Sequence, residues 1–305
     1  RYRSVSRGLG DVYKRQIFKN FDYEKLKARM KTYKERPLSF IMMLLVVLSA
    51  AITIGILGFI IVYILVNGIP YLTPELFAWK YTSDNCSMMP AIINTLIITI
   101  LALALAIPFG IFSAIYLVEY AKKGNKITAI VRITAETLTG IPSIVYGLFG
   151  YLFFVIALKW DYSILAGACT LAIMVLPVIM RTTEEALMSV PDSYREGSFG
   201  LGAGKLRTVF KIILPSAIPG ILSGVILSIG RIVGETAALM YTAGSVTEVA
   251  KSVFDSGRTL SVHMYSLSTE GLHINQSYAT AVVLLFLVIL INFVSGRIAK
   301  KIKKA

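Results

Sequence analysis

The sequence predicts an all-α, polytopic membrane protein with six transmembrane helices and both chain ends in the cytoplasm. Of its 305 residues, 56% are hydrophobic and only 16% are charged, and the mean hydropathy is +0.71. A soluble domain of this length does not need so much apolar side chain. The third observation is a series of nearly uncharged runs, each close to or above the roughly 20 residues that a helix needs to cross a bilayer.

Six such runs are the predicted spans, at residues 39–66, 92–118, 128–157, 163–180, 216–240 and 276–294. They form a transmembrane domain, 38–301, which follows a basic N-terminal segment, 1–37. Two of the connections are long, 181–215 and 241–275. Residues 1–16 contain no apolar run of signal-peptide length. We assign them no function and interpret them as a fragment, a tag or a read-through leader.

The positions of the lysines and arginines predict the orientation. With both ends inside, 25 of the 31 cations lie on the cytoplasmic side, 4 lie outside and 2 lie within spans. Cytoplasmic loops of membrane proteins carry such an excess of cations. The clusters lie beside the spans, so the formal charge of +14 does not indicate nucleic-acid binding. The loop 181–215 is therefore predicted to be cytoplasmic and 241–275 to be external.

Loop 181–215 predicts two short helices around a glycine corner. Ser193 and Glu196 have the spacing of a capping box at a helix start, and Pro191 offers an alternative start. Glycines at 200, 202 and 204 permit a tight turn. After the turn an apolar stripe with helical spacing follows, made of Leu206, Val209, Phe210 and Ile213. Pro215 is expected to close the segment before the next span.

Periodicity leaves two interpretations of this loop open, a hairpin lying on lipid headgroups or a docking element for a partner. The order Glu196-Gly197-Ser198, Gly202, Ile212-x-Leu214-Pro215 resembles the EAA motif of ABC importer permeases, with Gly197 and Ser198 in place of its two alanines. The resemblance implies a type I, MetI-like bundle whose loop seats in a cytoplasmic ATP-binding subunit dimer. The coupling residues it implies are Glu196, Gly197, Ser198, Gly202, Ile212, Leu214 and Pro215.

Two spans contain the same charged pattern, Arg132 with Glu136 and Arg231 with Glu235. Residues four apart share a helix face and can pair. Charges in a span are costly and usually face an interior or a water path, so these four and Thr236 are candidate pathway residues. For Arg132 and Glu136, the alternative is that the side chain of Arg132 simply reaches the inner membrane–water interface. For Arg231 and Glu235, a permanent ion pair that fixes the orientation of the helix remains an alternative.

Three further stretches resemble the phosphate-specific branch of these permeases, at 107–120, 140–150 and 230–237, and the resemblance covers about 38–301. It implies a bacterial inner-membrane permease for inorganic phosphate, with a second permease and an extracytoplasmic phosphate-binding protein as partners. The branch has two unlike permeases, PstA and PstC, and this chain is more similar to PstA. A PstC-like role and another oxyanion, such as sulfate or molybdate, remain alternatives.

Two segments carry structural expectations. Gly140 to Ser143 is predicted to break the third span, either to turn backbone groups toward a cavity or as a packing kink. The external loop 241–275 is too long for a simple connector, and the resemblance implies that it docks the binding protein. We expect a short helix at 246–254 within it. His263 and His273 are expected to be solvated.

No pattern in the sequence indicates an enzyme. It has no Gly-x4-Gly-Lys loop for nucleotide phosphates, and neither a nucleophile–base set nor a metal-ligand spacing. We therefore expect no catalytic, metal or cofactor-binding residue in this chain, and ATP hydrolysis by a partner. An intramembrane enzyme would need such a set. A membrane scaffold or sensor without transport is the remaining alternative of a different class.

Overall fold

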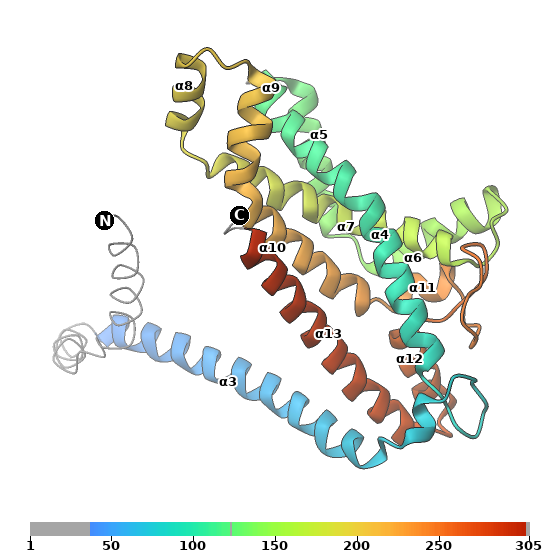
Figure 1. Cartoon of the computed structure of the whole chain (residues 1–305). Coiled ribbons are helices and arrows are strands. Elements are labelled where there is room, and N and C mark those ends of the chain that lie inside the picture. The colour runs from blue at the N-terminus through green and yellow to red at the C-terminus, as the bar shows by residue number, and fades with distance from the viewer. Residues whose placement is uncertain (1–36, 123, 303–305) are drawn as a thin grey trace, which may run out of the picture. The chain divides into compact units, whose positions relative to one another are not determined.

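A computed structural model describes residues 37–122 and 124–302. These residues form helices joined by turns, and none of them lies in a β-strand. Five of the described helices are long and apolar enough to cross a membrane, and a bent pair of helices makes a possible sixth span (Figure 1). The predicted all-α fold with six spans is confirmed. The leader at 1–16 and nearly all of segment 1–37 lie outside the described residues.

The chain divides into two compact units, Arg1–Tyr63 and Ile64–Ala305. The described part of the first unit belongs to helix α3 (Pro37–Gly68), which has 32 residues and no charged side chain. At about 1.5 Å per residue, a helix of this length is about 48 Å long, which exceeds the ~30 Å hydrocarbon core of a bilayer. Helix α3 is therefore long enough to span a membrane with some tilt. All later elements lie in the second unit.

Helix α7 (Ile164–Met188) lies at the centre of the second unit. It packs along α4 (Met89–Ile115) and against α10 (Leu214–Val233). Small residues allow the close approach of α4 and α7, since a Cβ added at Gly110 would lie 2.8 Å from Cγ2 of Ile179. The core between these helices contains large aliphatic side chains, among them Ile98, Leu171, Met174, Val175 and Ile179.

The third span is broken as predicted. Helices α5 (Lys126–Thr139) and α6 (Ser143–Gly150) meet at an angle of 105°, and the break holds Gly140 and Pro142. A proline removes one backbone donor and ends the preceding helix. At the break, the carbonyl of Leu138 accepts hydrogen bonds from the N–H of Ile141 (3.2 Å) and the hydroxyl of Tyr146 (2.8 Å). The protein itself thus satisfies this backbone group.

Several spans end in wide, π-helical turns, at Tyr116–Tyr120 after α4, Tyr151–Ala157 after α6 and Val209–Ile213 before α10. The last of these joins α9 (Lys205–Thr208) to α10, so that Lys205–Val233 is one continuous span candidate. Helix α13 (Ile274–Ile302) runs alongside α10 (Figure 1). It is the last span candidate along the chain.

Two predicted span ends differ from the structure. The fourth span continues beyond residue 180 to Met188, because the charged residues of its last two turns pair with α5 and with each other rather than ending the helix. The fifth span ends at Val233 rather than at 240. The chain breaks at Gly234 and resumes as the short helix α11 (Ala237–Thr242).

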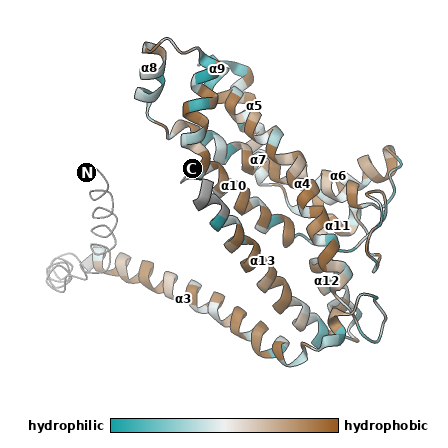
Figure 2. Cartoon of the chain, in the orientation of Figure 1, coloured by the Kyte–Doolittle hydropathy of each residue, from teal (hydrophilic) through white to brown (hydrophobic). Residues whose placement is uncertain are grey.

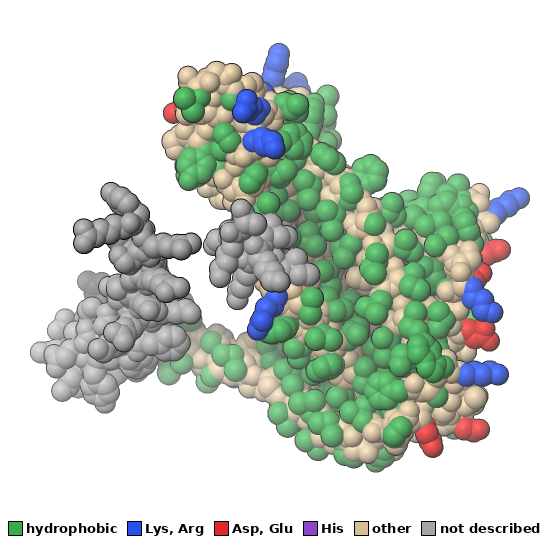
Figure 3. Space-filling model, viewed as in Figure 1, with side chains coloured by type: hydrophobic (Ala, Val, Ile, Leu, Met, Phe, Trp, Pro, Cys, Tyr) green, Lys and Arg blue, Asp and Glu red, His purple; other side chains and the backbone are tan. Residues whose placement is uncertain are grey.

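The two ends of the spans differ in polarity. Helices α8 (Asp192–Gly200) and α9 are more hydrophilic than the spans (Figure 2). In the space-filling view, lysines and arginines gather at the end that carries α8 and α9, whereas acidic and basic side chains mix along the opposite edge (Figure 3). This asymmetry is the one expected of a basic cytoplasmic side.

The predicted helix at 246–254 is wrong. Residues 243–259 form turns without a helix, and the loop instead contains helix α12 (Leu260–Glu270). Asn94 of α4 determines this course. Its side chain is fully buried, donates to the carbonyls of Glu248 (3.0 Å) and Arg258 (3.3 Å), and accepts from the backbone of Ala250 (3.1 Å). The external loop is therefore fastened to the N-terminal end of α4.

Candidate functional site

The loop between α7 and α10 contains the predicted pair of short helices around a glycine turn. Helix α8 covers Asp192–Gly200, and Gly202 in the turn has φ +80°, a conformation that favours glycine. The predicted capping box is wrong, because α8 begins one residue after Pro191 and has no side-chain cap. Pro191, the alternative start, marks the helix boundary.

Pro215 does not close the loop segment. It is the second residue of α10 but lies inside one continuous helical segment, from which it removes a single backbone hydrogen bond. The π-helical turn Val209–Ile213 directly before it carries the chain from α9 into α10 without a break. The loop is therefore connected to the fifth span by continuous helix.

The predicted apolar stripe after the turn is only partly correct. Val209 and Ile213 are buried against the end of α7, whereas Leu206 and Phe210 are exposed. The wide turn shifts the positions that face α7, so one regular stripe does not describe this segment. Exposed apolar side chains are available on this part of the chain for a partner, at Tyr194, Phe199, Leu201 and Leu206.

The residues of the EAA-like motif differ in their exposure. Glu196 and Gly197 are exposed on α8, and Ile212 and Leu214 are half-buried against the end of α7. Ser198 is buried, and its hydroxyl lies 2.8 Å from the hydroxyl of Thr208 in α9. Serine in place of the alanine of the motif thus gives a hydrogen bond between the two loop helices.

Replacing Gly197 with alanine is expected to stabilise α8 by about 0.5–1 kcal/mol, because glycine in a helix interior costs about that much relative to alanine. A Cβ at this position meets nothing within 4 Å. Hydrogen exchange of the α8 amides should slow by about two- to fivefold. Gly202→Ala is the matched control. It also meets open space but has φ +80°, and it should accelerate exchange. Slower exchange in both variants would contradict this account.

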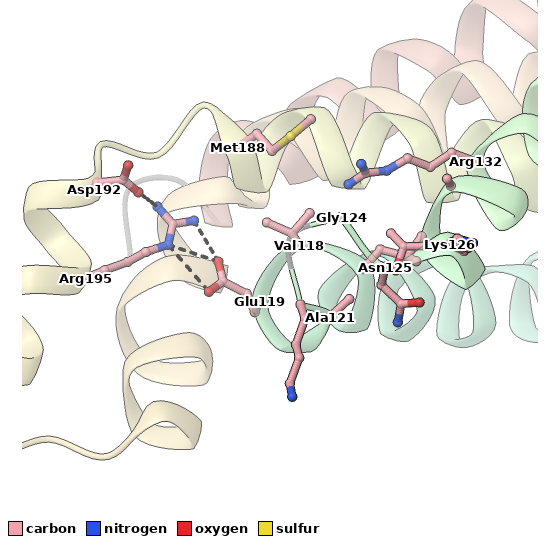
Figure 4. A pocket seen from close by; sticks show the side chains of 14 residues that line it. Val118, Glu119, Ala121, Gly124, Asn125, Lys126, Arg132, Met188, Asp192 and Arg195 are labelled. Carbon is pink, nitrogen blue, oxygen red and sulfur yellow. Dashed lines mark hydrogen bonds and ion pairs between the residues drawn. The ribbon is translucent and has the colours of Figure 1, made fainter.

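Arg195 connects α8 to the ends of two long helices. Its guanidinium lies 2.7 Å from Oε1 of Glu119 and 3.1 Å from Oδ1 of Asp192, and donates to the carbonyls of Leu187 (3.0 Å) and Val190 (2.9 Å). The hydrogen bond to Glu119 raises the pKa of Arg195, against the opposing effect of burial. Figure 4 shows this guanidinium between the two carboxylates at one side of a cavity of about 680 Å³, into which Arg132 points from the other side.

The sequence analysis did not single out Arg195 or Glu119. A signal existed, because Glu119 is the only acidic residue between residues 119 and 127, where three lysines follow it. An acidic side chain at the end of a span is a candidate for an ion pair with a cation of another element.

The predicted pairing of Arg132 with Glu136 is wrong. Arg132 pairs with Glu184 of α7 at 2.5 Å, and Glu136 lies 3.6 Å from Arg181 of the same helix. The two helices cross here, so partners on α7 replace the partner on the same helix. Together with Glu185 and two methionines, these charges line a cavity of about 280 Å³ between α5 and α7.

The predicted pairing of Arg231 with Glu235 is also wrong. Helix α10 ends at Val233, so the two residues do not share a helix. Glu235 is buried, and its carboxylate accepts from the backbone N–H of Ala238 (3.1 Å) at the start of α11. Thr236 is half-buried and directly precedes α11. No carboxylate within the described ranges pairs with Arg231.

Arg231 lines an open groove of about 540 Å³. Gly230 and Ser223 of α10 also line it, as does Asn292 of α13. The buried Oδ1 of Asn292 has no hydrogen-bond partner in the described part of the chain. The groove thus offers the guanidinium of Arg231 as a donor to an oxyanion, beside the apolar side chains of Ile226 and Leu227. Arg132 lines other cavities, so the structure does not bring the two arginines into one site.

The prediction that His263 is solvated is wrong. Its side chain is fully buried in α12 beside the ring of Tyr81, over which the guanidinium of Arg258 lies at 4.5 Å. Burial lowers the pKa of His263 from 6.5 to about 3, and the charge of Arg258 acts in the same direction. The backbone of Cys86 has a smaller, opposite effect, although neither ring nitrogen has a partner in hydrogen-bonding geometry. His273 is half-buried.

Acid is expected to destabilise this external region. His263 stays neutral in the folded protein above a pKa of about 3, whereas in the unfolded chain it takes up a proton below about pH 6.5. Stability contributed by the neutral imidazole is therefore lost as the pH falls below 6.5, by about 2 kcal/mol at pH 5. Thermal unfolding in detergent at pH 7 and pH 5 measures this loss.

The matched variants for this pH dependence are His263→Met and His273→Gln. His263→Met should remove about 2 kcal/mol of the difference between the two pH values. His273 lies outside the cluster of Tyr81 and Arg258, so His273→Gln should keep the wild-type difference. An unchanged difference in His263→Met would contradict the assignment.

Comparison with known families gives a match that includes the loop and the groove. The family model described as "binding-protein-dependent transport system inner membrane component" matches residues 106–304. This range contains α8, the glycine turn, α10 and Arg231.

Individual relatives and solved structures agree with this match. The chain is 35% identical over 240 residues to the "probable ABC transporter permease protein YqgI" of Bacillus subtilis, which covers 74% of this chain and 81% of that protein. It is 36% identical over 211 residues to the "phosphate transport system permease protein PstA 1" of Mycobacterium tuberculosis H37Rv, covering 68% of each. A chain of a bacterial alginate ABC transporter has a similar fold, with a TM-score of 0.66 at 15% identity, over 90% of this chain and 98% of that one.

Proposed function

Because this chain belongs to the family of binding-protein-dependent transport system inner membrane components, we propose that it is a permease subunit of an ATP-driven importer of inorganic phosphate. The observation that carries the proposal is the exposed helix α8, which the turn at Gly202 joins to the continuous helix Lys205–Val233 that holds Arg231 and its groove. The relative named as a phosphate permease supports phosphate as the substrate and a PstA-like role.

The coupling loop is the proposed contact with a cytoplasmic dimer of ATP-binding subunits. Helix α8 presents Glu196 together with the exposed side chains of Tyr194 and Phe199. Exposed aromatic side chains are typical of a protein interface. We propose that ATP binding and hydrolysis belong to that dimer and not to this chain.

The groove of Arg231 is the proposed part of the anion path. A guanidinium offers a planar fork of donors to phosphate oxygens, and here no carboxylate occupies it among the described residues. The groove is open on one side, and we propose that a second, PstC-like permease closes it. Glu235 and Thr236 shape the backbone beside Arg231, and Arg132 with Glu136 lies toward the cytoplasmic end of the path.

The external side is the proposed contact with an extracytoplasmic phosphate-binding protein. The loop 243–259 and α12 form a surface that Asn94 fastens to α4. A fastened loop suits docking, because less conformational entropy is lost on binding than with a mobile one.

Uptake of labelled phosphate by the complete complex in proteoliposomes tests this function. Uptake should require ATP, and unlabelled phosphate should compete better than sulfate or molybdate. Stronger competition by sulfate or molybdate would assign another oxyanion. A complex that assembles but shows neither uptake nor phosphate-stimulated ATP hydrolysis would instead indicate a scaffold or a sensor.

A further inference from the structure

The Arg195 junction, formed by Arg195, Glu119 and the carbonyls of Leu187 and Val190, fixes the coupling helix to two spans. Nε and Nη2 of Arg195 both reach Oε1 of Glu119, at 3.1 and 2.7 Å. Nη2 also reaches the carbonyl of Leu187, and Nη1 that of Val190. One side chain therefore connects α8 to the end of α4 and to the end of α7.

The carbonyl of Leu187 belongs to the last turn of α7, and that of Val190 lies two residues beyond its end. The last carbonyls of a helix have no partner within the helix, and they carry partial negative charge. A cation that binds them satisfies these groups and interacts favourably with the helix dipole. Arg195 thus caps α7 from the neighbouring helix, across the linker that contains Pro191.

Glu119 lies in the π-helical turn Tyr116–Tyr120 after α4. Only 8% of its side chain and 16% of that of Arg195 are exposed. Breaking this buried ion pair is costly, because replacing either residue leaves the charge of the other buried and unpaired. Asp192 differs, since 84% of its side chain is exposed, and its contact with Arg195 is screened by solvent.

The other polar attachment of α8 is weaker. Among the described residues, the side chains of α8 make hydrogen bonds or ion pairs to other elements through Arg195 and through Ser198, which bonds only Thr208. Beyond α8 the chain turns at Gly202 with φ +80°, and Cβ atoms at Gly200 and Gly204 would meet open space. The chain can thus bend on the α9 side of α8, while the junction fixes the α7 side.

We propose that Arg195 is a positioning residue for transport, which makes α8 move as one body with the ends of α4 and α7. This role rests on the proposed function. When the ATP-binding subunits displace α8, the junction transmits the displacement to the spans instead of letting the linker at Pro191 bend. Only arginine supplies donors in several directions from one planar group. A lysine keeps the charge but offers three donors from a single atom, so it cannot hold Glu119 and both carbonyls.

The test uses Arg195→Lys and Glu119→Gln in the complete reconstituted complex, with Asp192→Asn as the matched control. The first measurement is the number of ATP molecules hydrolysed for each phosphate taken up. This ratio should rise at least about fivefold in Arg195→Lys and Glu119→Gln and stay within about twofold of wild type in Asp192→Asn. A wild-type ratio in assembled Arg195→Lys and Glu119→Gln complexes would overturn the proposal, because a merely structural junction changes the yield of complex and not this ratio.

The second measurement is hydrogen exchange of the α8 amides in the purified chain, which requires neither phosphate nor assembly. Exchange in α8 should accelerate at least about tenfold in Arg195→Lys, while the central amides of α7 stay protected and show that the variant is folded. If Arg195→Lys leaves the exchange of the α8 amides unchanged, the proposed role of the junction is wrong, whichever anion the complex transports. A wild-type complex without phosphate uptake, by contrast, would contradict only the proposed function.

Discussion

Replacing Arg231 with glutamine is expected to lower phosphate uptake by about 10- to 100-fold. A hydrogen bond to a charged group contributes about 1.5–3 kcal/mol, and each 1.4 kcal/mol corresponds to a factor of ten. Arg231 lines the open groove and has no carboxylate partner among the described residues. Its loss therefore leaves no buried acid unpaired, and the complex should assemble normally. Labelled-phosphate uptake in proteoliposomes measures the effect.

The control for this variant is Arg231→Lys, which keeps the charge in the groove. Lysine binds phosphate as a point charge and not as a fork, so uptake should lie between wild type and Arg231→Gln. Wild-type uptake by a normally assembled Arg231→Gln complex would remove Arg231 from the anion path. It would leave a structural role at the end of α10.

Replacing Asn94 with alanine is expected to destabilise the external region by about 3 kcal/mol. The variant loses three hydrogen bonds to the loop, one buried and two partly buried, and each contributes about 1 kcal/mol. Gly257 approaches the same side chain, since a Cβ there would lie 2.7 Å from Nδ2 of Asn94. The loop 246–258 should then open to proteases.

Limited proteolysis of the purified chain measures this opening, as the rate of cleavage within 246–258. Thr99→Val is the matched control on the same helix, because Thr99 is also buried but bonds only the carbonyl of Thr95, one turn before it. It should keep the wild-type cleavage rate. Equal rates for Asn94→Ala and wild type would show that the loop is fastened by other contacts.

The sequence predicted those features that depend on neighbouring residues. Span lengths, the glycine turn at Gly202 and the break at Gly140 and Pro142 follow from hydropathy and from backbone preferences, so they could be predicted. The loop motif also indicated which side carries the coupling helix. These features place α8, α9 and α10 in order along the chain.

The remaining features depend on contacts between distant segments. A spacing of four allowed Arg132 to pair with Glu136, but α7 brings Glu184 closer, and spacing cannot reveal a partner 52 positions away. The burial of His263 likewise needs Tyr81 and Arg258 to meet over it. The course of the external loop depends on Asn94, more than 150 residues earlier.

The continuous helix from Lys205 to Val233 sets the scale of motion that transport would need. At 1.5 Å per residue, Arg231 lies about 39 Å along the axis from Lys205. A tilt of only about 5° at the loop would therefore displace the guanidinium end by about 3 Å, the length of one hydrogen bond. If Arg231 binds the anion as proposed, such leverage would let a small closure of the ATP-binding subunits release or capture it.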